Sequence, residues 1–137
     1  MKPEQFIKRY GINEAKKIID KAPNGTTHIH SVTLQNYMQG EGNNYVWCGS
    51  GRDGWYFSIY DTLNGMMALE DLKRLVESVD LVELLGGIDI AKRKVKMAEF
   101  NGFLLISVPV ENGFGDIYAQ KVERAIRDHE SIYGGGE

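Results

Sequence analysis

One helical stretch constrains the fold of this chain more than any other. Between residues 69 and 85, apolar residues recur at spacings of three and four, the period of one face of an α-helix. Charged residues fill the opposite side, and Gly86-Gly87 stops the helix. A second helix is expected at once, over residues 88–100 with Asp89 as its cap. The predicted apolar face consists of Leu69, Leu72, Leu75, Val76, Val79, Val82 and Leu85.

Further helices are expected towards both ends of the chain. Pro3 suits a first helical turn, Gly11 ends or kinks that helix, and Asn13 is expected to cap a second segment, EAKKIIDKA. The last helix is expected over residues 117–133, and residues 134–137 are expected to form a flexible tail. One face of that last helix would carry Ile117, Val122, Ala125, Ile126, His129 and Ile132.

The strand signals lie between these helices. Residues 26–37 are rich in Thr, Val, Ile and His, which favours an extended segment. Residues 45–48 and 55–60 predict a hairpin joined by GSGRDG. Residues 103–108 resemble a buried strand, and Pro109 indicates an edge position or a strand end. The sequence therefore predicts an α+β fold with a small, mainly antiparallel sheet and helices packed on it.

Size and composition place limits on the class of protein. A chain of 137 residues with 42% hydrophobic and 26% charged residues suits a single globular domain, expected to span residues 1–137. Cys48 is the only cysteine, which excludes an internal disulfide and favours a reducing compartment. We expect neither a signal peptide nor a membrane span, because no apolar run approaches about 20 residues. Cytoplasmic localisation is the resulting expectation.

The sequence holds none of the familiar catalytic motifs. The patterns GxSxG, HExxH, CxxC and the P-loop are absent, and GSGRDG lacks the Lys-Ser/Thr ending of a phosphate loop. Cys48 lies on an apolar strand, which is more typical of a small core residue than of a nucleophile. We therefore expect no cofactor. Enzymatic activity stays open, and a non-enzymatic role is favoured.

A histidine pair offers the main enzymatic alternative. His28 and His30 lie two residues apart in an extended segment, so both side chains would share one face. That spacing suits metal binding or chemistry on phosphate, as in a small metal-dependent hydrolase. A metal site needs further ligands, however, and His129 is the only other histidine. The pattern favours two polar residues on a half-exposed strand.

Aromatic residues gather around the predicted hairpin. Strand alternation separates Trp55 and Phe57 from Tyr56 and Tyr60, so one set should enter the core and the other should face outwards. An exposed set would form a platform for a protein hot spot or for stacked bases. The alternative is that helices cover both faces of the sheet. The predicted partner-binding residues are Tyr45, Trp47, Tyr56 and Tyr60.

The densest positive patch follows the glycine turn. It comprises Lys92, Arg93, Lys94 and Lys96. A helix, a glycine turn and a basic helix form the outline of a helix-turn-helix DNA reader, which makes nucleic-acid binding an alternative function. A net charge of −3 argues against binding through the whole surface. A solvated helix face is the simpler interpretation.

Two segments, LEDLKRLVESVDLVELLGGIDIAKRKV and AIRDHESIYGG, resemble small accessory proteins of temperate phages and prophages. The resemblance implies an intracellular protein that binds a host protein and modulates host defence or physiology. It brings no catalytic residues with it. A homo-oligomer is a further expectation, because a second copy often buries a leftover apolar stripe.

Overall fold

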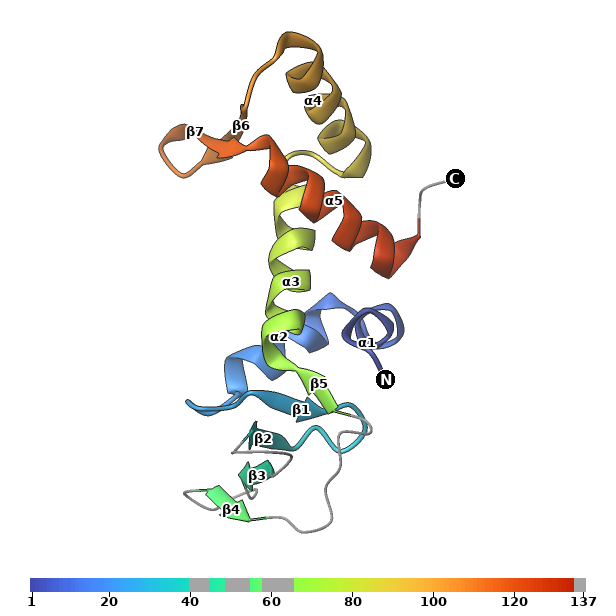
Figure 1. Ribbon diagram of the computed structural model, residues 1–137, viewed down its shortest axis with the longest axis vertical. Helices are drawn as coiled ribbons and strands as arrows, with labels where there is room; N and C mark the ends of the chain where they lie inside the picture. The colour runs from blue at the N-terminus through green and yellow to red at the C-terminus, as the bar shows by residue number, and fades with distance from the viewer. Residues whose placement is uncertain (40–44, 49–54, 58–65, 135–137) are drawn as a thin grey trace. The chain divides into compact units, whose positions relative to one another are not determined.

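The structure is a computed structural model that describes residues 1–39, 45–48, 55–57 and 66–134 (Figure 1). These residues form five helices and two small antiparallel sheets, so the predicted α+β class is confirmed. The chain divides into two compact units, Met1–Arg74 and Leu75–Glu137, called here the first and second units. Helix α3 (Leu69–Leu84) begins in the first unit and ends in the second. The expectation of a single domain stays a prediction.

Among the described helices, none combines the length and the apolar character needed to cross a bilayer.

The first unit combines two short helices with the larger sheet. Helices α1 (Pro3–Tyr10) and α2 (Ile12–Lys21) meet at Gly11. Its φ of 96° is a positive value that glycine adopts without strain. The sheet has the order β4-β3-β2-β1-β5, and every neighbouring pair is antiparallel (Figure 1). Its strands are β1 (His28–His30), β2 (Asn36–Gln39), β3 (Tyr45–Cys48), β4 (Trp55–Phe57) and β5 (Met66–Ala68).

Two local predictions for the first unit were wrong, and one strand was missed. Asn13 does not cap α2, because the helix begins one residue earlier with Gly11 at its cap position. The single extended segment at residues 26–37 is in fact β1, a turn and β2. The turn forms because the His30 ring accepts hydrogen bonds from two backbone N–H groups that follow it. Strand β5 was not predicted.

The core of the first unit lies where the helices and the inner strands supply apolar side chains. Ile29, at the centre of β1, is fully buried, and Met67 is its neighbour on β5. Among the described residues of this unit, the other buried apolar ones are Phe6, Ile7, Ala15, Tyr37, Leu69 and Leu72.

The second unit contains the end of α3, helices α4 (Ile88–Asn101) and α5 (Ala119–Tyr133), and the hairpin β6 (Leu105–Val110) and β7 (Gly113–Tyr118). The predicted glycine turn is confirmed, because Gly86 and Gly87 both have a φ of 110°. Gly87, not Asp89, is the cap of α4, and Asp89 lies in the first turn. The seven apolar residues predicted to line one side of the helix at residues 69–85 are all buried.

The hairpin differs most from the sequence-based expectation. No strand was predicted at the position of β7, and its last two residues were assigned to the start of the last helix, since GFGDIY has two glycines and no β-branched run. Pairing with β6 supplies the strand, in the register Leu105↔Tyr118 through Val110↔Gly113. The Ser107 carbonyl faces Lys94 instead of β7, and by alternation Pro109 also faces away from the ladder. The predicted edge position of Pro109 is confirmed.

The core of the second unit lies between the hairpin and the helices. One face of α4, formed by Ala91, Val95 and Ala98, clusters with Ile106 and Val108 of β6. Leu85 and Val122 complete this buried cluster, and partly buried apolar residues surround it. The hairpin thus has one face anchored in a core, which settles which of its side chains point away.

Candidate functional site

The two faces of the β6–β7 hairpin differ sharply in exposure. Ile106 and Val108 on the inner face are 5% and 8% exposed. Phe114 and Tyr118, on the opposite face of β7, are 80% and 68% exposed. Leu105 is the cross-strand neighbour of Tyr118 and is also exposed. The hairpin therefore presents aromatic and aliphatic side chains to the outside.

Neighbouring segments extend this exposed surface. Phe103 and Leu105 line a groove of 180 Å³ together with Met97 of α4. Phe103, Leu104 and Leu105 also border Asp116 on β7. We call the combined surface the apolar face; its members are Met97, Phe103, Leu104, Leu105, Phe114 and Tyr118, all exposed.

The residues of the apolar face expose a large total area. With about 200 Å² for each fully exposed residue, the six residues together expose on the order of 800 Å², a sum that includes their backbone and polar atoms. Monomeric proteins rarely leave more than about 300–600 Å² of contiguous apolar surface open, and the largest such patches are often functional. A standard protein–protein interface covers about 800 Å² on each partner. The summed exposure of the six residues is on the order of the area that one partner buries in such a contact.

A cationic hollow adjoins the apolar face at Tyr118. This hollow has a volume of 650 Å³ and is lined by Tyr118, Gln120, Lys121, Glu123, Arg124 and Arg127. Lys121, Arg124 and Arg127 follow one another at intervals of three residues, so they form one stripe along α5. All three are exposed, and in the described part of the chain none of them has an ion-pair partner. The hollow is suited to binding an anionic group.

The predicted histidine pair serves local structure. The Nδ1 atom of His28 lies 2.9 Å from the Thr27 hydroxyl, and burial lowers the pKa of His28 against the opposing effect of Asp71. The Nδ1 atom of His30 accepts the backbone N–H groups of Val32 and Thr33 at 3.1 and 3.2 Å. Within the described ranges, no group of three or more His, Cys, Asp or Glu residues could hold a metal ion. Metal-dependent hydrolysis by this pair stays a prediction.

The predicted basic cluster lies along α4. The Lys92 ammonium is 2.9 Å from the Glu130 carboxylate on α5, and the Lys94 ammonium donates to the Ser107 carbonyl at 3.5 Å. Arg93 and Lys96 are exposed. Two of the four cations therefore hold α4 to its neighbours, and nucleic-acid binding through this helix stays a prediction.

The predicted aromatic partner site lies in the first unit. Tyr45 and Trp47 belong to β3 and Tyr56 to β4, where Trp47 and Tyr56 are cross-strand neighbours. Trp47 is also opposite the buried Tyr37 on β2. Tyr60 lies outside the described residues. The proposed contact through these four residues stays a prediction.

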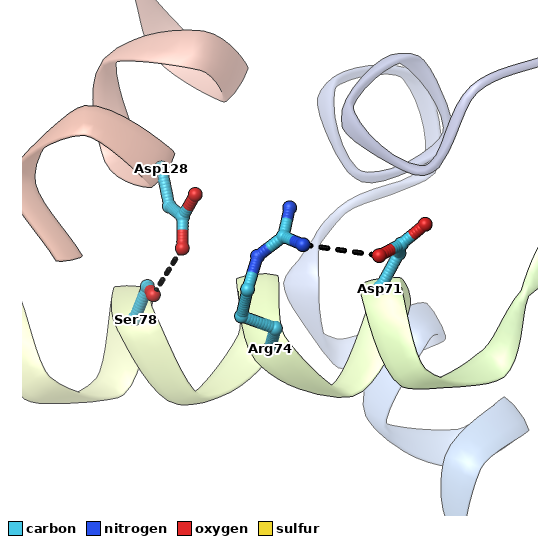
Figure 2. Close-up of polar contacts among 4 residues, drawn as sticks. All are labelled: Asp71, Arg74, Ser78 and Asp128. Carbon is cyan, nitrogen blue, oxygen red and sulfur yellow. Dashed lines mark hydrogen bonds and ion pairs between the residues drawn. The ribbon is translucent and has the colours of Figure 1, made fainter. Parts of the chain in front are cut away.

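A polar cluster on α3 and α5 has the residue types of a nucleophilic site but not its geometry. The Ser78 hydroxyl donates to the Asp128 carboxylate at 2.6 Å (Figure 2), so its proton is directed to a carboxylate and not to an imidazole base. The His129 ring packs on the Tyr133 ring with centroids 4.8 Å apart. Burial lowers the pKa of His129, while Glu83 and Glu130 oppose this shift. Burial and Glu83 raise the pKa of Tyr133. The hydrogen bond between Ser78 and Asp128 holds α3 to α5 and has a structural role.

Neither the apolar face nor the cationic hollow was predicted. The hollow carried a sequence signal, because Lys121, Arg124 and Arg127 recur every third residue. The alternation of Phe114, Asp116 and Tyr118 with Gly115 and Ile117, which are both partly buried, was a weaker signal. This alternation can be interpreted only if residues 113–118 form a strand, and the two glycines in that segment argued against a strand.

Comparison with known proteins finds no family model, no curated protein and no solved structure that matches this chain. The functional argument therefore rests on the geometry of the described residues.

Proposed function

We propose that this protein is a non-enzymatic binding protein that grips a partner protein with the apolar face of its β6–β7 hairpin. The observation that carries the proposal is the contrast between the two hairpin faces. The inner face is anchored in the core, and the outer face leaves Phe114 and Tyr118 largely exposed. Exposure of these apolar side chains to water is unfavourable, whereas their burial against a partner protein would be favourable.

The chemistry of the apolar face suits a protein partner. Interface cores are enriched in Phe, Tyr and Met, all of which occur here. Tyr118 and Leu105 lie side by side across the two strands, so they offer one rigid centre for a binding hot spot. Side chains on paired strands lose less entropy on binding than side chains on a free loop.

The resemblance to phage and prophage accessory proteins makes a host protein the proposed partner. Such a protein would act by occupying a host surface, without making or breaking covalent bonds. The aromatic residues Tyr45, Trp47, Tyr56 and Tyr60 would then provide a second contact in the first unit. Both points are part of the proposal and depend on the same capture experiment.

That experiment is affinity capture from a bacterial lysate, with quantitative mass spectrometry of what each variant retains. Phe114→Ser removes an exposed member of the apolar face, and Val32→Ser is the matched control, an exposed apolar residue of the first unit. We expect Phe114→Ser to retain at least about tenfold less partner, as for loss of a hot-spot residue. Val32→Ser should retain as much as the wild type. Equal retention by Phe114→Ser, with an unchanged circular dichroism spectrum, would exclude the apolar face as the interface.

A further inference from the structure

Tyr118 joins the apolar face to the cationic hollow in a fixed geometry. It is both the last residue of β7 and the cap residue of α5, so no loop separates the strand from the helix. The N–H group of Ala119 donates to the Leu104 carbonyl at 2.8 Å, which ties this junction to the residue before β6. A ligand seated on Leu105 and Tyr118 would therefore meet the stripe of α5 at a set position.

The positive charge of the stripe on α5 contrasts with the acidic composition of the second unit. Carboxylates outnumber cations in residues 75–137, yet Lys121, Arg124 and Arg127 line this one hollow with a single acidic neighbour, Glu123. Three cations that follow one another at intervals of about one helical turn repel one another. A bound anionic group would relieve that repulsion. Arginine pairs well with carboxylates, because its planar guanidinium can donate two parallel hydrogen bonds.

The acidic residues beside the cationic hollow favour carboxylates on a protein over the phosphates of a nucleic acid as its ligand. Asp116 lies within the border of the apolar face and Glu123 within the hollow, and both would repel a continuous phosphate backbone. The net charge of −3 repels any anionic ligand at longer range, and it repels a nucleic acid with a charge on every nucleotide more strongly than a peptide with a few carboxylates. A peptide can instead place separate carboxylates on the cations and set apolar side chains on Leu105 and Phe114.

We infer that the partner segment is acidic and amphipathic: its apolar side chains cover the apolar face, and its Asp or Glu carboxylates pair with Lys121, Arg124 and Arg127. This inference rests on the proposed function and names the chemistry of the partner at that same surface.

The test uses the full chain and peptides of defined composition. The probe is a fluorescein-labelled peptide that alternates Glu-Glu with Leu-Phe, and the reference peptide carries Gln in place of every Glu. Fluorescence anisotropy would give the dissociation constants at low and at physiological salt. We expect the Glu peptide to bind at least about tenfold more tightly than the Gln peptide, with the difference shrinking as salt screens the charges. Labelled single-stranded and duplex DNA serve as competing polyanions.

The variants separate the hollow from positive charge in general. Arg124→Glu/Arg127→Glu reverses two charges of the hollow, and Arg93→Glu/Lys96→Glu makes the same change at exposed positions of α4. We expect the first variant to weaken binding of the Glu peptide about tenfold or more, and the second to change it less than about twofold. If reversal unfolds the chain, Arg124→Gln/Arg127→Gln removes the charges more mildly, and its expected loss has the same direction.

The outcomes separate the two levels of the proposal. Equal binding of the Glu and Gln peptides, equal losses in the two charge-reversal variants, or tighter binding of DNA than of the Glu peptide would each overturn the acidic partner. If the lysate partner is lost by Phe114→Ser but kept by Arg124→Glu/Arg127→Glu, the proposed function stands and the inference fails. If both variants keep that partner, both proposals fail.

Discussion

The Ser78 hydroxyl donates a 2.6 Å hydrogen bond to the Asp128 carboxylate and so joins α3 to α5 inside the second unit. Ser78 is only 7% exposed, and Asp128 is half-buried. Hydrogen bonds to a charged acceptor are shorter and stronger than neutral ones, and the 2.6 Å separation falls in that range. Removal of the hydroxyl would leave the half-buried carboxylate without this donor.

Ser78→Ala is therefore expected to lower the free energy of unfolding by about 2 kcal/mol. Asp128→Asn should lower it as well, and the double variant should lose less than the sum of the two. Urea unfolding followed by circular dichroism would measure all three. Ser131→Ala is the control, because its hydroxyl bonds the backbone carbonyl of Asp128 at an exposed position and should change stability by less than about 0.5 kcal/mol. A loss from Ser78→Ala no larger than that of the control would contradict the role of this bond.

The two faces of the hairpin predict opposite responses to truncation. Val108→Ala removes buried methyl groups and should cost about 2 kcal/mol of unfolding free energy. Phe114→Ala removes a larger side chain but exposes little that was hidden, so we expect a change within about 0.5 kcal/mol. The same urea titrations would compare them. A large loss from Phe114→Ala would mean that this ring is part of the core and not of a binding surface.

The long helix was predictable because its information is local. Seven apolar residues at spacings of three and four describe one side of a helix wherever that helix packs, and all seven are buried. The stop at Gly86-Gly87 was equally local, since the backbone there adopts a φ of 110°. The antiparallel pairing of β3 with β4 followed from strand-forming residues on either side of the sequence GSGRDG.

The candidate site could not be predicted because it depends on partners that are distant in sequence. Strand β7 exists through its ladder with β6, while its own residues favour a loop. Which hairpin face is exposed follows from the contact of Ile106 and Val108 with α4 and α5. The buried side of α5, which includes Val122 and Ala125, was predicted, but the position of Tyr118 beside the stripe depends on strand β7, which was not.

The half-buried histidines predict a dependence of stability on pH. Burial lowers the pKa values of His28 and His129, so the unfolded chain takes up protons near the ordinary value of 6.5 before the folded chain does. The unfolded state then binds more protons, and stability falls as the pH drops below that value until the folded histidines also become protonated. Glu83, Glu130 and Lys92 surround His129 and modulate its shift.

Unfolding free energies between about pH 7.5 and about pH 5.5 would test this linkage. His129→Gln is expected to make the decline with falling pH shallower, and His28→Gln/His129→Gln shallower still. The slope is the relevant quantity, because loss of the contact between His129 and the Tyr133 ring also lowers stability at every pH. A decline as steep in the double variant as in the wild type would assign the pH dependence to carboxylates instead.

The two glycines at the ends of α4 predict different tolerance of side chains. Gly87 caps the start of the helix with φ 110° and ψ 173°, a region that only glycine occupies readily. Gly102 caps its end with φ 72° and ψ 20°, in the left-handed region that asparagine also visits. A Cβ atom added at either position would meet no heavy atom within 4 Å, so backbone strain alone decides the outcome.

Gly87→Ala is expected to cost about 2 kcal/mol of unfolding free energy, and Gly102→Ala about 1 kcal/mol. Asparagine should recover part of the loss at position 102 and none at position 87, because its side chain stabilises the left-handed conformation only. Urea unfolding of the four variants would measure these differences under one set of conditions. Partial recovery by asparagine at position 87 would show that the α3–α4 turn adopts an ordinary left-handed cap and not the extended glycine conformation.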